Sequence, residues 1–94
     1  MLEPNLIPRK AERTAIRVLD GEALILVIDR GELHRLNEVG TRVFELCDGA
    51  NSMGAITQEI VRGFEVEEAM ARGDVELFVT QLVEVGALLL PEPD

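Results

Sequence analysis

The chain has 94 residues, of which 47% are hydrophobic and 29% are charged, a balance typical of a soluble globular domain with one core. The single cysteine excludes an intrachain disulfide and gives no sign of an oxidising compartment, so we expect a cytoplasmic protein. The net charge of −9 disfavours nucleic acid as a partner, because residues 43–94 hold the whole excess, with eleven Asp/Glu against two Lys/Arg.

The first residues predict an arm rather than a folded element. Residues 1–12 contain Pro4 and Pro8 and show no periodic apolar pattern, which is typical of a partly ordered terminal segment. We therefore expect an N-terminal arm over 1–12, a folded domain over 13–90 and a C-terminal tail over 91–94.

Three short strands are predicted after the arm. Thr14–Leu19 contains β-branched residues in rough alternation, Asp20-Gly21 is a hairpin turn signal, and Ala23–Ile28 has the composition of a second strand. Beyond a turn at Arg30-Gly31, Glu32–Leu36 is predicted to be a short edge strand. The longest apolar run, in the second strand, is far below the ~18 residues of a membrane helix, so no membrane partner is expected.

Three helices are predicted to follow the strands. Asn37 is a suitable N-cap for a helix over 38–47, and Ser52 can cap a second helix over 53–64. The third helix is expected to run from Glu67 to Val85. The order predicts an α+β, winged-helix-like domain in which a three-stranded antiparallel β-meander is followed by a three-helix cluster.

The third helix has apolar residues on more than one side. A step of ~100° per residue gathers one set on the predicted core face and a second set on a flank outside it. The core set is Val75, Phe78, Leu82 and Val85, with Val79 and Val83 beside it, and the flank set is Met70, Asp74, Leu77 and Gln81. Leu77 is either a singly exposed leucine or part of a groove wall for a bound peptide.

No pattern in the sequence indicates catalysis. The glycines never form a GxGxxG or GxxxxGK[ST] loop, so no phosphate cradle is predicted. One cysteine and one histidine cannot supply a zinc site of the usual kind, and the many carboxylates are expected to form a solvated surface. We therefore expect no catalytic residue, no metal site and no cofactor in the chain.

Several single residues have structural interpretations. Cys47 is expected to be a small buried hydrophobe, and Phe44, Phe64 and Phe78 are expected to lie in the core. His34, on the predicted edge strand, could face a bound peptide or could be a solvated side chain that discourages edge aggregation. The sequence leaves these two roles of His34 open.

The chain resembles the PqqD family (pyrroloquinoline quinone synthesis protein D), which overlaps the precursor-peptide recognition elements of ribosomal natural-product pathways. The residues that carry the resemblance are Leu36-Asn37, Asp48-Gly49, Ile56, Ile60, Asp74-Val75, Phe78, Leu82 and Gly86-Ala87-Leu88. The resemblance implies a module without chemistry of its own, which holds the leader segment of a precursor peptide and presents it to a modifying enzyme, often a radical S-adenosylmethionine enzyme.

The resemblance also implies where the peptide would bind. The peptide would add as a strand beside the predicted edge strand and lie against the third helix. The candidate peptide-binding residues are therefore Glu32, Leu33, His34, Arg35, Leu36, Met70, Asp74, Leu77 and Gln81. We expect the precursor peptide and the modifying enzyme as partners, and a chain that is a monomer or a weak homodimer.

Two other functions fit the predicted architecture. In a winged-helix DNA-binding regulator the third helix would read the major groove, but the acidic residues of this segment would repel phosphates. In a permanent structural subunit of an enzyme complex the exposed strand would be a constant contact rather than a peptide site.

Overall fold

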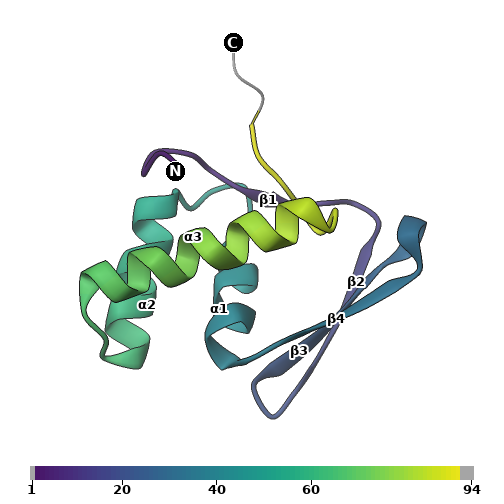
Figure 1. The fold of residues 1–94 in the computed structure, drawn as a ribbon, viewed down its shortest axis with the longest axis horizontal. Helices are drawn as coiled ribbons and strands as arrows, with labels where there is room; N and C mark the ends of the chain where they lie inside the picture. The colour runs from purple at the N-terminus through teal and green to yellow at the C-terminus, as the bar shows by residue number, and fades with distance from the viewer. Residues whose placement is uncertain (1, 92–94) are drawn as a thin grey trace.

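A computed structural model of the chain describes residues 2–91 and contains a three-stranded antiparallel sheet, which lies to one side of the helices (Figure 1). The strands are β2 (Thr14–Leu19), β3 (Glu22–Val27) and β4 (Glu32–Leu36), in the order β2-β3-β4. The predicted α+β class, with a meander before the helices, is therefore confirmed. The second strand ends one residue earlier than predicted, because Ile28 begins a short 3-10 turn, η1 (Ile28–Arg30).

The turn between β2 and β3 explains the tight hairpin. Asp20 and Gly21 have φ angles of 53° and 78°, a left-handed pair that matches the twist of the flanking strands. The pairing of Leu19 with Glu22 closes this two-residue turn and sets the register of the whole sheet.

The three predicted helices are present and two of their caps are confirmed. They are α1 (Glu38–Leu46), α2 (Met53–Phe64) and α3 (Glu68–Glu84). The Asn37 side chain accepts from the Gly40 N–H at 2.8 Å, and Ser52 accepts from the Ala55 N–H at 3.1 Å. Figure 1 shows α3 running across both other helices toward the sheet. Within residues 2–91, no helix combines the length and the apolar character needed to cross a membrane.

The N-terminal arm is more structured than its composition predicts. It contains β1 (Arg9–Lys10), which pairs antiparallel with β5 (Leu88–Leu89) from the other end of the chain. Earlier in the arm, backbone carbonyls accept from the first N–H groups of α2, Leu6 from Met53 at 2.7 Å and Pro4 from Gly54 at 2.8 Å. Of the predicted tail, Pro91 is exposed, and residues 92–94 lie outside the described residues.

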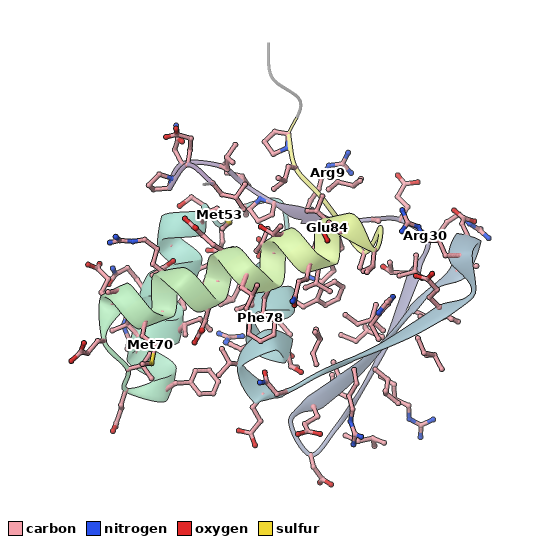
Figure 2. The ribbon with its side chains drawn as sticks, viewed as in Figure 1. Arg9, Arg30, Met53, Met70, Phe78 and Glu84 are labelled. Atoms are coloured by element: carbon pink, nitrogen blue, oxygen red, sulfur yellow. The ribbon has the colours of Figure 1, made fainter. Side chains whose placement is uncertain are left out.

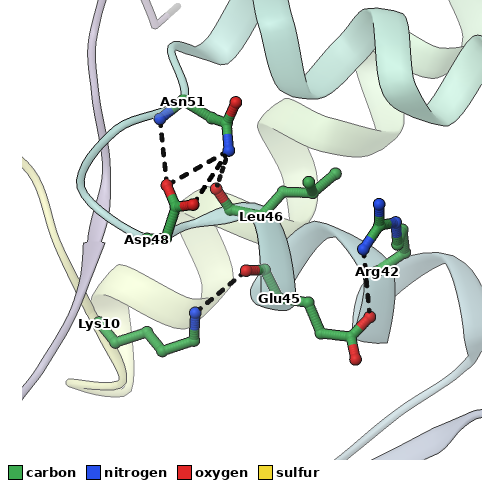
Figure 3. Close-up of polar contacts among 6 residues, drawn as sticks. All are labelled: Lys10, Arg42, Glu45, Leu46, Asp48 and Asn51. Carbon is green, nitrogen blue, oxygen red and sulfur yellow. Dashed lines mark hydrogen bonds and ion pairs between the residues drawn. The ribbon is translucent and has the colours of Figure 1, made fainter.

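The loop between α1 and α2 joins this arm to the helices (Figure 3). The Lys10 ammonium donates to the carbonyls of Glu45 and Cys47, both at 3.2 Å, at the C-terminal end of α1. The Asp48 carboxylate accepts from the Ala50 N–H at 2.9 Å and the Asn51 N–H at 3.1 Å. These backbone hydrogen bonds lower the pKa of Asp48, because they favour its charged form.

The core lies between the inner face of the sheet and the three helices. The sheet contributes Ala23, Ile25 and Val27, and α1 contributes Val43 and the fully buried Phe44. Cys47 is buried, as predicted, whereas Phe64 and Phe78 are only partly buried and pack against the edge of the core.

The predicted core face of α3 is partly wrong. The buried residues are Ala71, Val75, Val79 and Leu82, so the buried arc is rotated toward Val79. Phe78 and Val85, which were assigned to the centre of that face, are half-buried at its margin. Since this margin faces the sheet, the difference changes which residues can line a site between α3 and β4.

Candidate functional site at the edge of the sheet

The free backbone groups of β4 follow from the hydrogen-bond pattern of the sheet. The Ile28 N–H donates to the Arg13 carbonyl at 3.0 Å, so these residues form a hydrogen-bonded pair at the end of the β2–β3 ladder. Hydrogen-bonded pairs alternate along an antiparallel ladder. The residues of β3 that direct their N–H and C=O groups toward β4 are therefore Ala23, Ile25 and Val27.

This pattern leaves two residues of β4 with outward-directed backbone groups. The partners of the three β3 residues are Leu36, His34 and Glu32. Leu33 and Arg35 lie between them and direct their N–H and C=O groups away from β3, toward the open edge of the sheet. An added strand could therefore pair with β4 through these two residues.

Thr41 fixes the end of β4 nearest to α1. Its hydroxyl accepts from the Ala23 N–H at 2.8 Å and donates to the Leu36 carbonyl at 3.4 Å. Thr41 is buried, so no water competes for these groups. The hydroxyl thus bridges the last pair of the β3–β4 ladder and ties the edge strand to the first helix.

Two adjoining depressions lie between β4 and α3. The first has a volume of about 130 Å³ and is lined by His34, Arg35, Leu36, Gln81, Leu82 and Val85. The second is a wider, more open depression of about 560 Å³, lined by Glu22, Arg35, Asn37 and Phe78. Both are bordered by Arg35, and together they are called the β4–α3 groove. It lies beside the open edge of β4, so a strand added there would face it.

Phe78 reaches this groove because α3 passes close to α1. Phe78 is a residue of α3 and is labelled in Figure 2. A Cβ added at Gly40 of α1 would lie 2.6 Å from one of the atoms of its partly buried ring. Gly40 therefore leaves the space that the ring occupies. The close approach of the two helices holds an aromatic wall at one end of the groove.

The two faces of β4 differ in character. His34 and Leu36 pair with the core residues Ile25 and Ala23, so their side chains point to the inner side, toward α3. Leu33 points to the opposite side and is 68% exposed. Side chains of an added strand would alternate in the same way, half toward the β4–α3 groove and half toward the outer face.

Arg35 and His34 of β4 each lie close to a carboxylate. Arg35 lies 3.5 Å from the Glu22 carboxylate, and the His34 ring nitrogen lies 3.3 Å from the Glu32 carboxylate. Both contacts are partly exposed and can open without a large cost. The edge can therefore exchange these partners for groups of a ligand.

The structure brings together only some of the residues predicted for the site. His34, Arg35 and Leu36 from β4 meet Gln81 from α3 in one depression. Glu32 begins the strand and contacts His34, whereas Leu33 faces away from the groove.

The other predicted residues of α3 lie beside the groove rather than in it. Met70 is 61% exposed and Leu77 is 54% exposed, and neither lines the groove; Asp74 is half-buried and does not line it either. Phe78, Leu82 and Val85, which the sequence places in the core, also line the groove and are not among the predicted site residues. The sequence carries a signal for two of them, because Phe78 and Val85 lie one helical turn before and after Gln81 and therefore share its side of the helix.

Chemically reactive groups are few in this part of the chain. Burial raises the pKa of the Cys47 thiol to about 12, against a smaller opposing effect of Lys10, so the thiolate is disfavoured. Among residues 2–91, no three His, Cys, Asp or Glu side chains lie close enough to hold a metal ion.

Comparison with solved structures gives three similar folds. "TbiB1 in Complex with the TbiA(beta) Leader Peptide" has a TM-score of 0.80 and 20% identity, over 92% of this chain and 99% of that chain. "Lasso peptide synthetase B1 complexed with the leader peptide" has a TM-score of 0.77 and 24% identity, over 88% of this chain and 98% of that chain. The heterocyclase TruD has a TM-score of 0.63 and 15% identity, over 95% of this chain but only 12% of that chain. At these identities the likeness establishes the fold.

Comparison by sequence gives the family. No curated protein matches the chain. The family described as "Coenzyme PQQ synthesis protein D (PqqD)" matches residues 22–88, which span the sheet from β3 onward, all three helices and the start of β5. Because this match covers well over half of the sequence, the chain belongs to the PqqD family.

Proposed function

We propose that the chain is a non-catalytic module that binds the leader segment of a ribosomally made precursor peptide and presents it to a peptide-modifying enzyme. The observation that carries this proposal is the open edge of β4 beside the β4–α3 groove. An edge strand supplies affinity through backbone pairing, and a neighbouring groove supplies specificity for alternate side chains.

The similar structures support the peptide as ligand. Two of them, TbiB1 and lasso peptide synthetase B1, are complexes with leader peptides, and each is covered almost completely by the likeness. Membership of the PqqD family supports a role in the synthesis of pyrroloquinoline quinone or of a peptide natural product. A radical S-adenosylmethionine enzyme is the proposed kind of partner.

The peptide strand is proposed to pair with the backbones of Leu33 and Arg35. Its inward side chains would contact His34, Leu36, Gln81 and Val85 in the β4–α3 groove. A segment that leaves the groove over the exposed flank of α3 would contact Met70, Asp74 and Leu77, while Glu32 would lie at the other end of the paired strand.

The test is a titration of a labelled leader peptide against a groove variant. The half-buried Val85 lines the groove at the C-terminal end of α3, where a cation is favourable for the helix, so Val85→Lys should preserve the fold. A charged side chain in the groove should weaken binding of the peptide by at least about tenfold, which corresponds to ~1.4 kcal/mol of binding free energy.

Thr80→Lys is the matched control, because Thr80 is exposed on α3 and lies outside the groove. It should bind the peptide as wild type does. Equal affinity of wild type and Val85→Lys would mean that the peptide does not use the groove.

A further inference from the structure

The outer face of the sheet, opposite the core, carries an ordered set of apolar and basic side chains. The register places Ala15, Leu26 and Leu33 in one row across the three strands, and Arg17, Leu24 and Arg35 in the next row. These six residues are called the outer face. Because directly paired residues point to the same side of a sheet, an apolar row lies beside a leucine flanked by two arginines.

Several large apolar side chains of the sheet are exposed to solvent. Among residues 2–91, ten large hydrophobic residues are exposed, and three of them, Leu19, Leu24 and Leu33, point to the outer side of the sheet. Ile16 and Val18 are also exposed, but they pair with the core residues Ile25 and Ala23 and point to the inner side. Single exposed leucines need no explanation, but apolar side chains that gather on one element mark an interaction surface.

The charges of the outer face indicate the kind of partner. Arg35 contacts Glu22 at 3.5 Å, whereas Arg17 forms no ion pair with any residue of the described chain. An apolar centre with arginine at its margin is the composition of a protein interface. Carboxylates on the partner would complement both guanidinium groups.

A second copy of this chain fits the outer face poorly. Two copies stacked face to face about a two-fold axis would present the same patch to each other. Such a stack would gather the arginines at 17 and 35 of both copies in one interface, and this concentration of like charge opposes association. A different protein with an acidic margin satisfies the same geometry.

We propose that the outer face is a docking surface for a partner protein whose own contact surface has an apolar centre surrounded by Asp and Glu. The identity of that partner as the peptide-modifying enzyme rests on the proposed function. Leu33 and Arg35 belong both to the outer face and to the open edge of β4. A peptide strand paired there extends the docking surface by one strand, so the enzyme contacts the module and the peptide together.

The experiment measures binding of the purified chain to a radical S-adenosylmethionine peptide-modifying enzyme from the same organism, the proposed kind of partner, by biolayer interferometry at two salt concentrations. Leu24→Glu should weaken binding about thirtyfold, and Arg17→Glu about fivefold with a smaller dependence on salt. Ile7→Glu is the control for Leu24→Glu, since these residues are 41% and 39% exposed. Arg62→Glu, on α2, is the control for Arg17→Glu.

Each outcome decides the proposal. Both controls should bind the enzyme within about twofold of wild type, and all four variants should bind the leader peptide equally. A wild-type chain that does not bind the enzyme, or outer-face variants that bind as well as their controls, overturn the docking surface. Sedimentation showing a homodimer that Leu24→Glu dissociates also overturns it, in favour of self-association. A chain that binds the enzyme through this face but binds no leader peptide would instead refute the proposed function.

Discussion

Thr41 illustrates how one buried hydroxyl supports the site. It bridges the Ala23 N–H and the Leu36 carbonyl, at the end of the strand to which the peptide is proposed to bind. Thr41→Val keeps the side-chain shape but leaves a buried N–H unpaired, which should lower the free energy of unfolding by about 1–3 kcal/mol. Urea denaturation measures this loss.

The control for this prediction is Thr80→Val, because Thr80 is exposed on α3. Its effect should stay within about 0.5 kcal/mol. If Thr41→Val were as stable as wild type, the hydroxyl would not be what closes the β3–β4 ladder.

Cys47 should be an inert thiol in the folded chain. Its burial raises the pKa to about 12, and the thiolate is the species that reacts with alkylating reagents. At pH 8 the native protein should react with iodoacetamide far more slowly than the protein unfolded in guanidinium, as mass spectrometry would measure. Rapid modification of the native state would indicate an accessible, reactive cysteine.

The same shift predicts a loss of stability at alkaline pH. The unfolded thiol loses its proton near 9.0 and the native thiol near 12, so the native state binds more protons between these values. The contribution of Cys47 is therefore present below pH 9 and declines as pH rises toward 12. Comparison of Cys47→Ala with wild type across this range isolates that contribution.

Among the elements, β4 gives the sharpest test of backbone pairing. The N–H of Leu33 points to the open edge, whereas the N–H of His34 points to β3. Leu33→Pro removes only a backbone donor that is available to the peptide. It should therefore preserve the fold and weaken binding of the leader peptide by at least about tenfold. His34→Pro should instead destabilise the sheet.

Leu33→Ala separates the backbone effect from loss of the side chain. It should bind the peptide nearly as wild type does, because the Leu33 side chain faces the outer side. Peptide titrations paired with thermal melts distinguish these variants. Undiminished peptide binding by a folded Leu33→Pro would exclude pairing at this edge.

The elements differ in how far the sequence predicts them. Thr14–Leu19, Glu32–Leu36 and the second helix have their predicted bounds, because hairpin turns and an N-cap serine mark their ends locally. β1 and β5 were missed, since each has two residues and they pair across almost the whole chain. Such a pairing depends on tertiary packing and leaves no periodic pattern.

The strand side of the candidate groove follows from the sequence more directly than the helix side does. Strand order alone makes β4 an edge, whereas the side of α3 that faces β4 depends on helix rotation. Met70 and Leu77 are apolar but exposed, so the apolar residues of α3 do not form a single stripe. Their periodicity therefore does not fix the rotation of the helix about its axis. Phe78 and Val85 therefore look like core residues in the sequence, although they line or border the groove.

At the scale of the whole molecule, charge separates the sheet from the helices. Residues 1–42 carry seven Lys/Arg and seven Asp/Glu, whereas residues 43–94 carry nearly all of their charge as carboxylates. The half of the chain that contains the sheet is therefore neutral overall and presents arginines on its outer face, whereas the helical half is strongly acidic. A partner with an acidic margin would be steered toward the sheet and away from the helices.

The same asymmetry predicts that the chain does not bind duplex DNA. In a DNA-binding regulator of this architecture, α3 would enter the major groove. α3 carries Glu68, Asp74, Glu76 and Glu84 against Arg72, and the Arg72 guanidinium already contacts Glu68 at 3.4 Å. Since nucleic-acid affinity depends on cations that displace counterions from phosphates, a helix of this charge opposes the approach to DNA.

A fluorescence-polarisation titration of labelled duplex DNA at physiological salt should therefore show no binding up to at least ~10 μM protein. Salt-sensitive, sequence-specific binding below that concentration would favour a regulator over the peptide-binding module.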